Sequence, residues 1–157
     1  MRTSPLPPAS RRGVATTVAT EGEFAGWRTF NDDGFETHIG ALWYRQEPDD
    51  SMRCAFRVEK KHTRDTGQVH GGCLMTFADY CLHVIAKPVM EEHGVTINFA
   101  GDFIDAAREG DLIIGTGEVI RAGGSLIFVR GQLTVAERTL FTFSGTIKRL
   151  RPQRPEA

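Results

Sequence analysis

Residues 67–86 read GQVHGGCLMTFADYCLHVIA, and most of this stretch predicts one long helix. Residues 71–86 are too many for a single strand and are apolar on nearly every side, which is typical of a helix enclosed by other structure. The helix is expected to end before Pro88, because proline lacks the backbone N–H that would continue it.

Four segments after this helix have the composition of β-strands. We expect them at residues 95–104, 112–121, 125–135 and 140–150. Turn signals at Gly123-Gly124 and at Ala136-Glu137-Arg138 predict that the last three strands form an antiparallel meander. One central helix with a curved antiparallel sheet wrapped around it is an α+β architecture.

The segment before the long helix is expected to support this core. Apolar residues recur at helical spacing between residues 35 and 42, behind the capping signal Asn31-Asp32-Asp33, which predicts a short helix. A strand should follow at residues 42–46, and alternation over residues 54–58 predicts another after a turn. We interpret residues 24–44 as a lid or brace on the main core.

The chain is expected to be one domain. Residues 1–23 are rich in Pro, Ser, Thr and Gly and have few large apolar side chains, which predicts a disordered leader. The domain should then span residues 24–152 and leave a short tail at residues 153–157.

Composition argues against several classes of protein. The 157 residues include 19 Lys and Arg against 20 Asp and Glu, a net charge of -1, so nucleic-acid binding is not expected. No apolar run reaches the roughly 18 residues of a membrane-spanning helix. Three cysteines, Cys54, Cys73 and Cys81, lie inside apolar segments, which favours buried thiols in a reducing cytoplasm.

Several motifs together resemble one known family. The order is His70-Gly71-Gly72, then Asp79 on the helix, then VTINFAGDFIDAAREGD at residues 95–111 and FSGTIKRLRP at residues 143–152. This order resembles the PaaI-type acyl-CoA thioesterases of the hotdog superfamily. The resemblance implies a hotdog fold, a homodimer or dimer of dimers whose sheets join edge to edge, and hydrolysis of an acyl-CoA thioester at the subunit interface. Coenzyme A would be part of the substrate, so no separate cofactor is expected.

The glycines at the start of the helix suit this chemistry. A thioester carbonyl needs a donor aimed at its developing oxyanion, and the free N–H groups of a helix N-terminus are such donors. Gly71 and Gly72 stand there, where the lack of a side chain lets a carbonyl approach. The alternative is that both glycines only permit a sharp turn into the helix.

Asp79 is an acid in an otherwise largely apolar helix, where an unpaired charge is costly. We interpret Asp79 as a nucleophile toward the acyl carbon or as a general base toward water, and the sequence does not separate these roles. The structural alternative is an acid that only hydrogen-bonds a partner across a dimer interface.

Helix geometry adds a constraint on the site. Asp79 follows Gly71 by eight residues, a rise of about 12 Å. Both groups must lie roughly 3 Å from the reacting centre, so one chain cannot supply both to one carbonyl. Two antiparallel copies of the helix would bring Asp79 beside the partner subunit's Gly71, and we therefore expect two equivalent sites per dimer.

Three further residues are candidates near the acid. The resemblance implies that the Thr96 hydroxyl holds the attacking water, although threonine is also an ordinary strand residue. His70 could touch the thioester, but we favour a role as helix cap. Arg64 stands where the family has Asn or Gln, and it should either lower the pKa of Asp79 or pair with Asp65.

The phosphates of coenzyme A need cations or free amides. Arg121 and Ser125 flank the Gly123-Gly124 turn and are expected to bind them, unless they form only an ordinary charged hairpin end.

The sequence also bears on chemistries other than hydrolysis. A metal site built from His70, Cys73, Cys81 and His83 is not expected, because their spacing fits no zinc pattern. Two functions stay open: an acyl-CoA-binding protein without catalysis, which Arg64 would favour, and a hydratase or dehydratase that uses His70 or His83.

Overall fold

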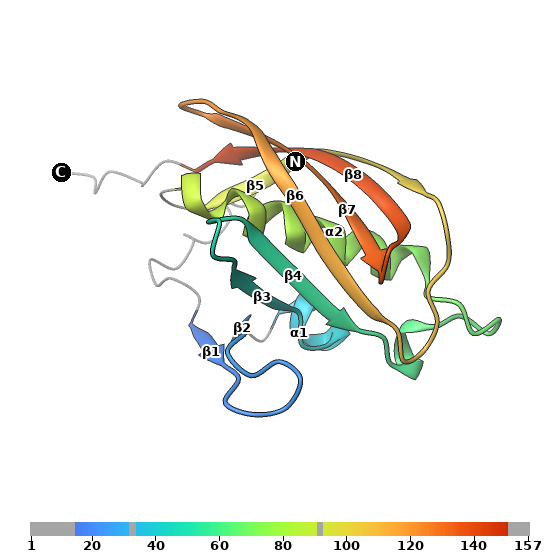
Figure 1. The fold of residues 1–157 in the computed structure, drawn as a ribbon. Helices are drawn as coiled ribbons and strands as arrows, with labels where there is room; N and C mark the ends of the chain where they lie inside the picture. Colours follow the sequence, from blue (N-terminus) through green and yellow to red (C-terminus); the bar gives the residue numbers. More distant parts are fainter. Residues whose placement is uncertain (1–14, 32–33, 91–92, 151–157) are drawn as a thin grey trace, which may run out of the picture.

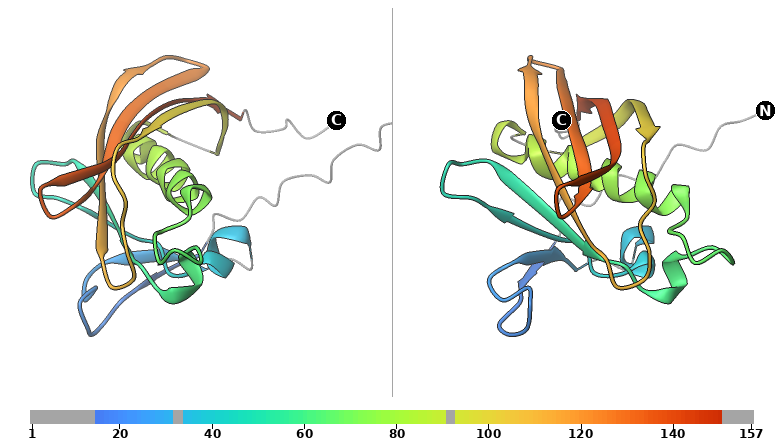
Figure 2. Two further views of the ribbon diagram at one scale, coloured as in Figure 1. Left: turned by 90° about the vertical axis from the view of Figure 1, so that its right-hand side faces the viewer. Right: turned by 45° about the vertical axis from the view of Figure 1, so that its right-hand side comes forward.

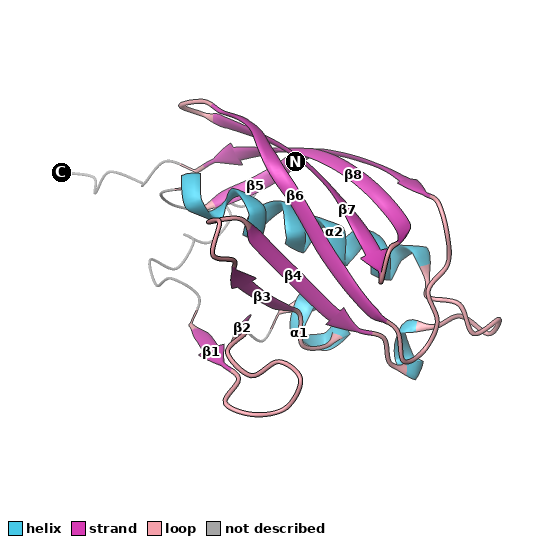
Figure 3. Ribbon diagram, viewed as in Figure 1, coloured by secondary structure: helices cyan, strands magenta, loops and turns pink. Residues whose placement is uncertain are grey.

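The computed structural model describes residues 15–31, 34–90 and 93–150, which form a curved eight-stranded antiparallel sheet around one long helix (Figure 1, Figure 3). The helices are α1 (Phe35–Ile39) and α2 (Gly71–Ala86). The strands are β1 (Thr16–Val18), β2 (Arg28–Phe30), β3 (Trp43–Gln46), β4 (Met52–Arg57), β5 (Gly94–Phe103), β6 (Leu112–Ala122), β7 (Leu126–Val135) and β8 (Arg138–Arg149). Their order across the sheet is β1-β2-β3-β4-β6-β7-β8-β5. The predicted α+β architecture is confirmed.

Helix α2 has the bounds that the apolar run predicts, and a 3₁₀ turn that contains Pro88 follows it directly. The left panel of Figure 2 shows α2 inside the curve of the sheet. Its packing is dense: Phe77 and Leu82 are at most 1% exposed, and full burial of such a side chain contributes about 1.5–3 kcal/mol. The enclosed helix is therefore the centre of the core.

The meander of the last three strands is also confirmed. Strands β6, β7 and β8 pair antiparallel in sequence order. The turn between β7 and β8 uses Ala136, whose φ of 51° is unusual for a residue with a side chain. Strand β5 then pairs with β8 and ends the sheet, so β5 is an edge strand.

An irregularity in β5 affects which side chains face α2. The register with β8 shifts between Thr96 and Asn98, so Ile97 is an extra residue in a β-bulge. Thr96 bonds a side chain of α2, while Phe99 stacks on the fully buried Phe141. The bulge therefore turns both Thr96 and Phe99 toward the inner face of the sheet.

The N-terminal region differs from the prediction in two respects. Residues 15–23 are not a disordered leader, because they contain β1, which pairs with β2. Helix α1 starts after Gly34 and has no side-chain cap, so the predicted cap at Asn31-Asp32-Asp33 is wrong for Asn31, while Asp32 and Asp33 lie outside the described residues. Residues 1–14 and the predicted tail at 153–157 also lie outside them.

The predicted brace is confirmed by its contacts with the core. The Tyr80 hydroxyl on α2 donates to the carbonyl of Leu42 at 3.1 Å, and His62 Nε2 contacts the carbonyl of Ile39. Phe30 of β2 packs edge-on against Tyr80 with ring centroids 5.8 Å apart. These contacts join residues 30–42 to α2 and to the 3₁₀ turn Lys60–His62, both of which are distant from them in sequence.

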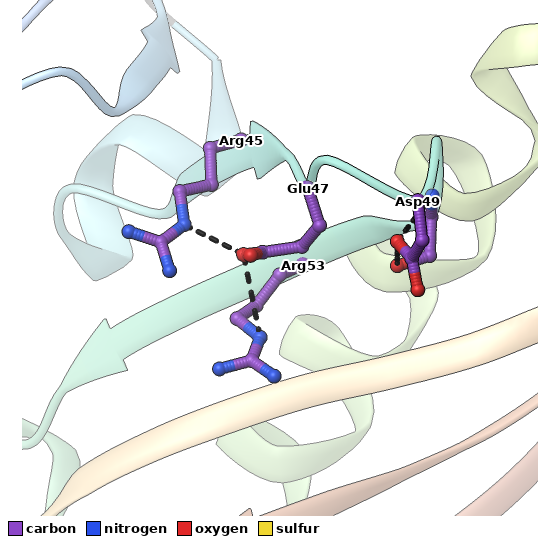
Figure 4. Close-up of polar contacts among 5 residues, drawn as sticks. Arg45, Glu47, Asp49 and Arg53 are labelled. Atoms are coloured by element: carbon purple, nitrogen blue, oxygen red, sulfur yellow. Dashed lines mark hydrogen bonds and ion pairs between the residues drawn. The ribbon is translucent and has the colours of Figure 1, made fainter.

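The turn between β3 and β4 carries a small charge cluster (Figure 4). Arg45 and Arg53 are directly opposite each other across the two strands. Two like charges in such a cross-strand pair destabilise the sheet. Glu47 Oε1 lies 2.6 Å from Arg45 Nε and 3.5 Å from Arg53 Nε, so it offsets this repulsion. At the predicted turn, Asp49 accepts hydrogen bonds from the backbone and hydroxyl of Ser51.

Gly117 lets α2 approach β6 closely, and a side chain there should destabilise the fold. A Cβ at Gly117 would lie 2.3 Å from the carbonyl oxygen of Arg130 and 2.8 Å from Cδ1 of Ile85 on α2. We expect Gly117→Ala to lower the free energy of unfolding by about 1–3 kcal/mol, measured by urea denaturation. Gly124→Ala is the matched control, because a Cβ there meets open space, and an equal loss in both variants would contradict the prediction.

Candidate active site

The N-terminus of α2 is capped by a histidine. Nδ1 of His70 accepts a hydrogen bond from the Gly72 N–H at 2.9 Å, and the His70 carbonyl accepts from the N–H of Cys73 at 2.9 Å. The prediction that His70 caps the helix is confirmed. The part of the chain that the structure describes offers the Gly71 N–H no acceptor, so this donor stays available at the positive end of the helix dipole.

Glycine occupies positions 71 and 72 because a side chain there would lack space, and not because the backbone has an unusual conformation. Neither Gly71 nor Gly72 has a left-handed φ, so the turn itself does not require them. A Cβ at Gly71 would lie 3.0 Å from the ring of Phe103, which is 57% exposed. A Cβ at Gly72 would lie 3.1 Å from Nδ1 of His70 and would disturb the cap.

The acid of α2 is hydrogen-bonded to β5. The Thr96 hydroxyl donates to Asp79 Oδ1 at 2.7 Å, so the structure brings these two predicted residues together. Asp79 is half-buried, with Ala78 and Leu82 beside it fully buried. No hydrogen bond to Asp79 Oδ2 occurs among the described residues, which leaves this oxygen for chemistry.

The third member of this group is His83, which the sequence suggested only for a hydratase or dehydratase and not as a neighbour of Thr96. Nε2 of His83 lies 3.0 Å from Thr96 Oγ1. Burial lowers the pKa of His83, and the negative charge of Asp79 opposes this shift only in part. The signal was the spacing of four residues between Asp79 and His83, which places both on one face of a helix.

The side of the molecule next to this group exposes large apolar side chains. They are Met75 on α2 and Val95, Ile97, Phe103 and Ile104 on or directly after β5. Because β5 is an edge strand of ten residues, its outer row of backbone groups is open to pairing with another strand. Both features are typical of a surface that another polypeptide covers.

In the described chain, Arg64 neither pairs with Asp65 nor bonds to Asp79. It is exposed in a tight hairpin closed by the bridge between Thr63 and Val69. Within residues 34–90 and the other described ranges, its side chain forms no ion pair with Asp65 and no ion pair or hydrogen bond with Asp79.

The predicted phosphate-binding turn joins β6 to β7. Arg121 and Ser125 are exposed there, but no contact links either to Gly71, Asp79 or Thr96 in the described chain. The Gly123 N–H is not free, since it donates to the Leu126 carbonyl at 2.8 Å. Arg149, which sequence reasoning did not select, holds the turn by donating from Nε to the Gly123 carbonyl at 3.1 Å.

Other features of the described chain bear on alternative chemistry. Its His, Cys, Asp and Glu side chains form no group of three or more that could hold a metal ion. Cys54 and Cys81 are buried free thiols as predicted, and Cys73 is half-buried, which raises its pKa to about 11. No helix in the described ranges is long and apolar enough to cross a membrane.

Two hollows lie away from the candidate residues. A groove of about 730 Å³ on the outer face of the sheet is lined by residues such as Asp102, Glu118 and Arg130. A smaller one of about 200 Å³ lies between β2, α1 and Tyr80. Neither is lined by Gly71 or Asp79, so neither hollow of a single subunit encloses the candidate site.

The family model described as the thioesterase superfamily matches residues 66–149. The chain belongs to the thioesterase superfamily. A Pseudomonas aeruginosa protein named as an esterase is 30% identical over 111 residues, which are 68% of this chain and 81% of that protein. Mouse acyl-coenzyme A thioesterase 13 is 25% identical over 107 residues, 67% of this chain and 76% of the mouse protein.

Several solved structures share the fold. A Streptococcus pneumoniae hypothetical thioesterase solved with coenzyme A has a TM-score of 0.62 at 19% identity, over 69% of this chain and 88% of that one. Thermus thermophilus PaaI, the phenylacetic acid degradation protein, has a TM-score of 0.65 at 20% identity, over 75% of this chain and all of PaaI. These likenesses confirm the hotdog fold and the predicted resemblance, and membership supports a hydrolase role.

The His70 cap can be tested by its effect on stability. We expect His70→Ala to lower the free energy of unfolding by about 1 kcal/mol, because the Gly72 N–H loses its acceptor. His70→Asn keeps an acceptor at the cap position and should lose less. Equal losses in the two variants, measured by urea denaturation, would argue against capping by the side chain.

Proposed function

We propose that this protein hydrolyses acyl-CoA thioesters, with Asp79 as the reacting acid and the Gly71 N–H as the oxyanion donor. The observation that carries the proposal is the Asp79 carboxylate on α2, one oxygen of which accepts a hydrogen bond from Thr96 on β5. The first N–H of the same helix, that of Gly71, has no acceptor among the described residues. Superfamily membership, the mouse acyl-coenzyme A thioesterase and the relative solved with coenzyme A support the choice of substrate.

Two routes fit this geometry. As a general base, Asp79 takes a proton from water while the water oxygen attacks the acyl carbon, and the departing thiolate then receives that proton. As a nucleophile, Asp79 forms a mixed anhydride and expels the thiolate, and water then cleaves the anhydride. In both routes the carbonyl oxygen becomes negative, which the Gly71 N–H stabilises.

The proposal requires a homodimer. Asp79 and Gly71 of one chain stand eight residues apart on α2, a rise of about 12 Å, so the donor comes from the partner subunit. Pairing of the β5 edges across a twofold axis would satisfy their open backbone groups and cover Val95 and Ile97. It would also enclose the Asp79 side chain, which lines neither of the two hollows described above.

Exposed polar and cationic side chains are proposed to bind the rest of coenzyme A. Arg121 and Ser125 at the β6–β7 turn have no protein partner in the described residues that competes with a phosphate, and Arg149 holds the turn beside them. Arg64 offers a second exposed cation in the hairpin that leads to His70. A dimer of dimers would leave this scheme unchanged, because the site needs one twofold axis only.

Replacement of the acid tests the reaction. Asp79→Asn keeps the shape of the side chain and removes its charge, so kcat should fall by about 10²–10⁴-fold across a panel of acyl-CoAs. Thiol release is followed with a disulfide reagent. Protein thiols should interfere little, because Cys54 and Cys81 are buried and burial raises the pKa of Cys73 to about 11.

Asp102→Asn is the matched control, because Asp102 is an exposed acid on the same β5 strand, in the outer groove. Unchanged turnover in Asp79→Asn would refute the mechanism. Binding of acyl-CoA by the wild type without thiol release would favour the noncatalytic alternative. Loss of enoyl absorbance without free thiol would favour a hydratase, for which His83 beside Thr96 is the available imidazole.

Mixed dimers test whether the two chains share each site. Asp79→Asn and Gly71→Val subunits should both be inactive alone, the second because its side chain crowds the carbonyl. Co-expressed with different tags, they should recover about one quarter of wild-type activity, since half of the dimers are mixed and each mixed dimer has one intact site.

A site contained in one chain gives a different result. Every subunit of the mixed dimer would then carry one defect, and activity would stay at the level of the single variants. Sedimentation of the wild type under assay conditions completes the test, because an active monomer would exclude a shared site.

A further inference from the structure

The proposed mechanism leaves His83 without a task. His83 lies on α2 one turn after Asp79 and is half-buried. Its Nε2 is 3.0 Å from Thr96 Oγ1, and that oxygen is 2.7 Å from Asp79 Oδ1. The three side chains form a continuous hydrogen-bonded chain that leaves α2, reaches β5 and returns to α2.

Counting protons fixes the direction of this chain. A threonine hydroxyl has one proton to donate and accepts through its oxygen lone pairs. The Thr96 proton goes to Asp79, so the oxygen must accept from His83, and Nε2 must carry a proton. An unprotonated Nε2 would place its lone pair against that of the hydroxyl at 3.0 Å.

The charge state of the ring agrees with this count. Burial lowers the pKa of His83, and the Asp79 carboxylate, which is the charged group acting on the ring, raises it by less. The ring is therefore neutral near pH 7 and has a single N–H. Thr96, its contact on β5, does not titrate, so the hydrogen bond persists through neutral pH.

We propose that His83 is a positioning residue, which donates from Nε2 to Thr96 and thereby fixes the threonine hydroxyl toward Asp79. This inference rests on the proposed function. With the hydroxyl fixed, Oδ1 of Asp79 stays bonded and Oδ2 remains directed to water or the acyl carbon. Without the donor, the hydroxyl rotates among other acceptors, and the carboxylate plane is no longer held.

Two substitutions separate donation from simple filling of space. His83→Gln keeps an N–H donor and does not titrate, whereas His83→Leu keeps bulk and has no donor. We expect His83→Leu to lower kcat about tenfold with little change in KM, and His83→Gln to stay within about threefold of wild type. Equal losses in both variants would overturn the proposal, because a donor would then have no special value.

A double-mutant cycle tests the route through Thr96. In a Thr96→Val background the hydroxyl is absent, so His83→Leu should have no further effect on kcat. The same tenfold loss in both backgrounds would overturn the proposal, since His83 would then act independently of Thr96.

One measurement tests the hydrogen bond from His83 without relying on catalytic activity. Nitrogen-15 NMR of the histidine rings at neutral pH distinguishes the two neutral tautomers and the charged ring. We expect His83 as the Nε2–H tautomer, and a loss of this preference in Thr96→Val. An Nδ1–H tautomer or a charged ring would overturn the inference even in an active enzyme. The Nε2–H tautomer in a protein without thiol release would support the hydrogen-bonded chain and refute the proposed function.

Discussion

A carboxylate on a helix with buried neighbours needs hydrogen bonds, because removing an unpaired charge from water costs more free energy than the packing around it provides. Asp79 meets this condition through the Thr96 hydroxyl at 2.7 Å. This hydrogen bond joins the central helix to β5. Strand β5 lies at the edge of the sheet and pairs with one neighbour, β8. The placement of β5 on α2, and with it the geometry of the candidate site, depends on this contact.

The parts of the fold that sequence predicts are those with a strong repeating pattern. The run at residues 71–86 is apolar on nearly every side because the sheet covers most of α2, so its burial and both its ends could be predicted. The meander followed from turn residues between segments with β-propensity. The pairing of acid and Thr96 came from the family resemblance, and the structure brings these residues together.

The parts that sequence misses depend on tertiary contacts. Strand β1 is exposed along its whole length, so it has no alternation of apolar residues to detect. In β5, plain alternation would put Thr96 and Phe99 on opposite faces. The bulge at Ile97 brings both to the inner face, and no local pattern marks it. The contact of His83 with Thr96 depends on where β5 packs on α2, so no local pattern predicts it.

Strand β5 has two tasks that cannot be separated. Its inner face presents Thr96 to Asp79, while its free edge and the exposed Ile97 form the surface proposed to meet a second subunit. The bulged residue is itself Ile97, so the irregularity that turns Thr96 toward the helix also displays an apolar side chain at the edge. A second subunit that pairs with this edge would restrict the strand, and hence the hydroxyl that holds the acid. Assembly would then do more than deliver the partner subunit's Gly71, because it would also steady the carboxylate that the amide must face.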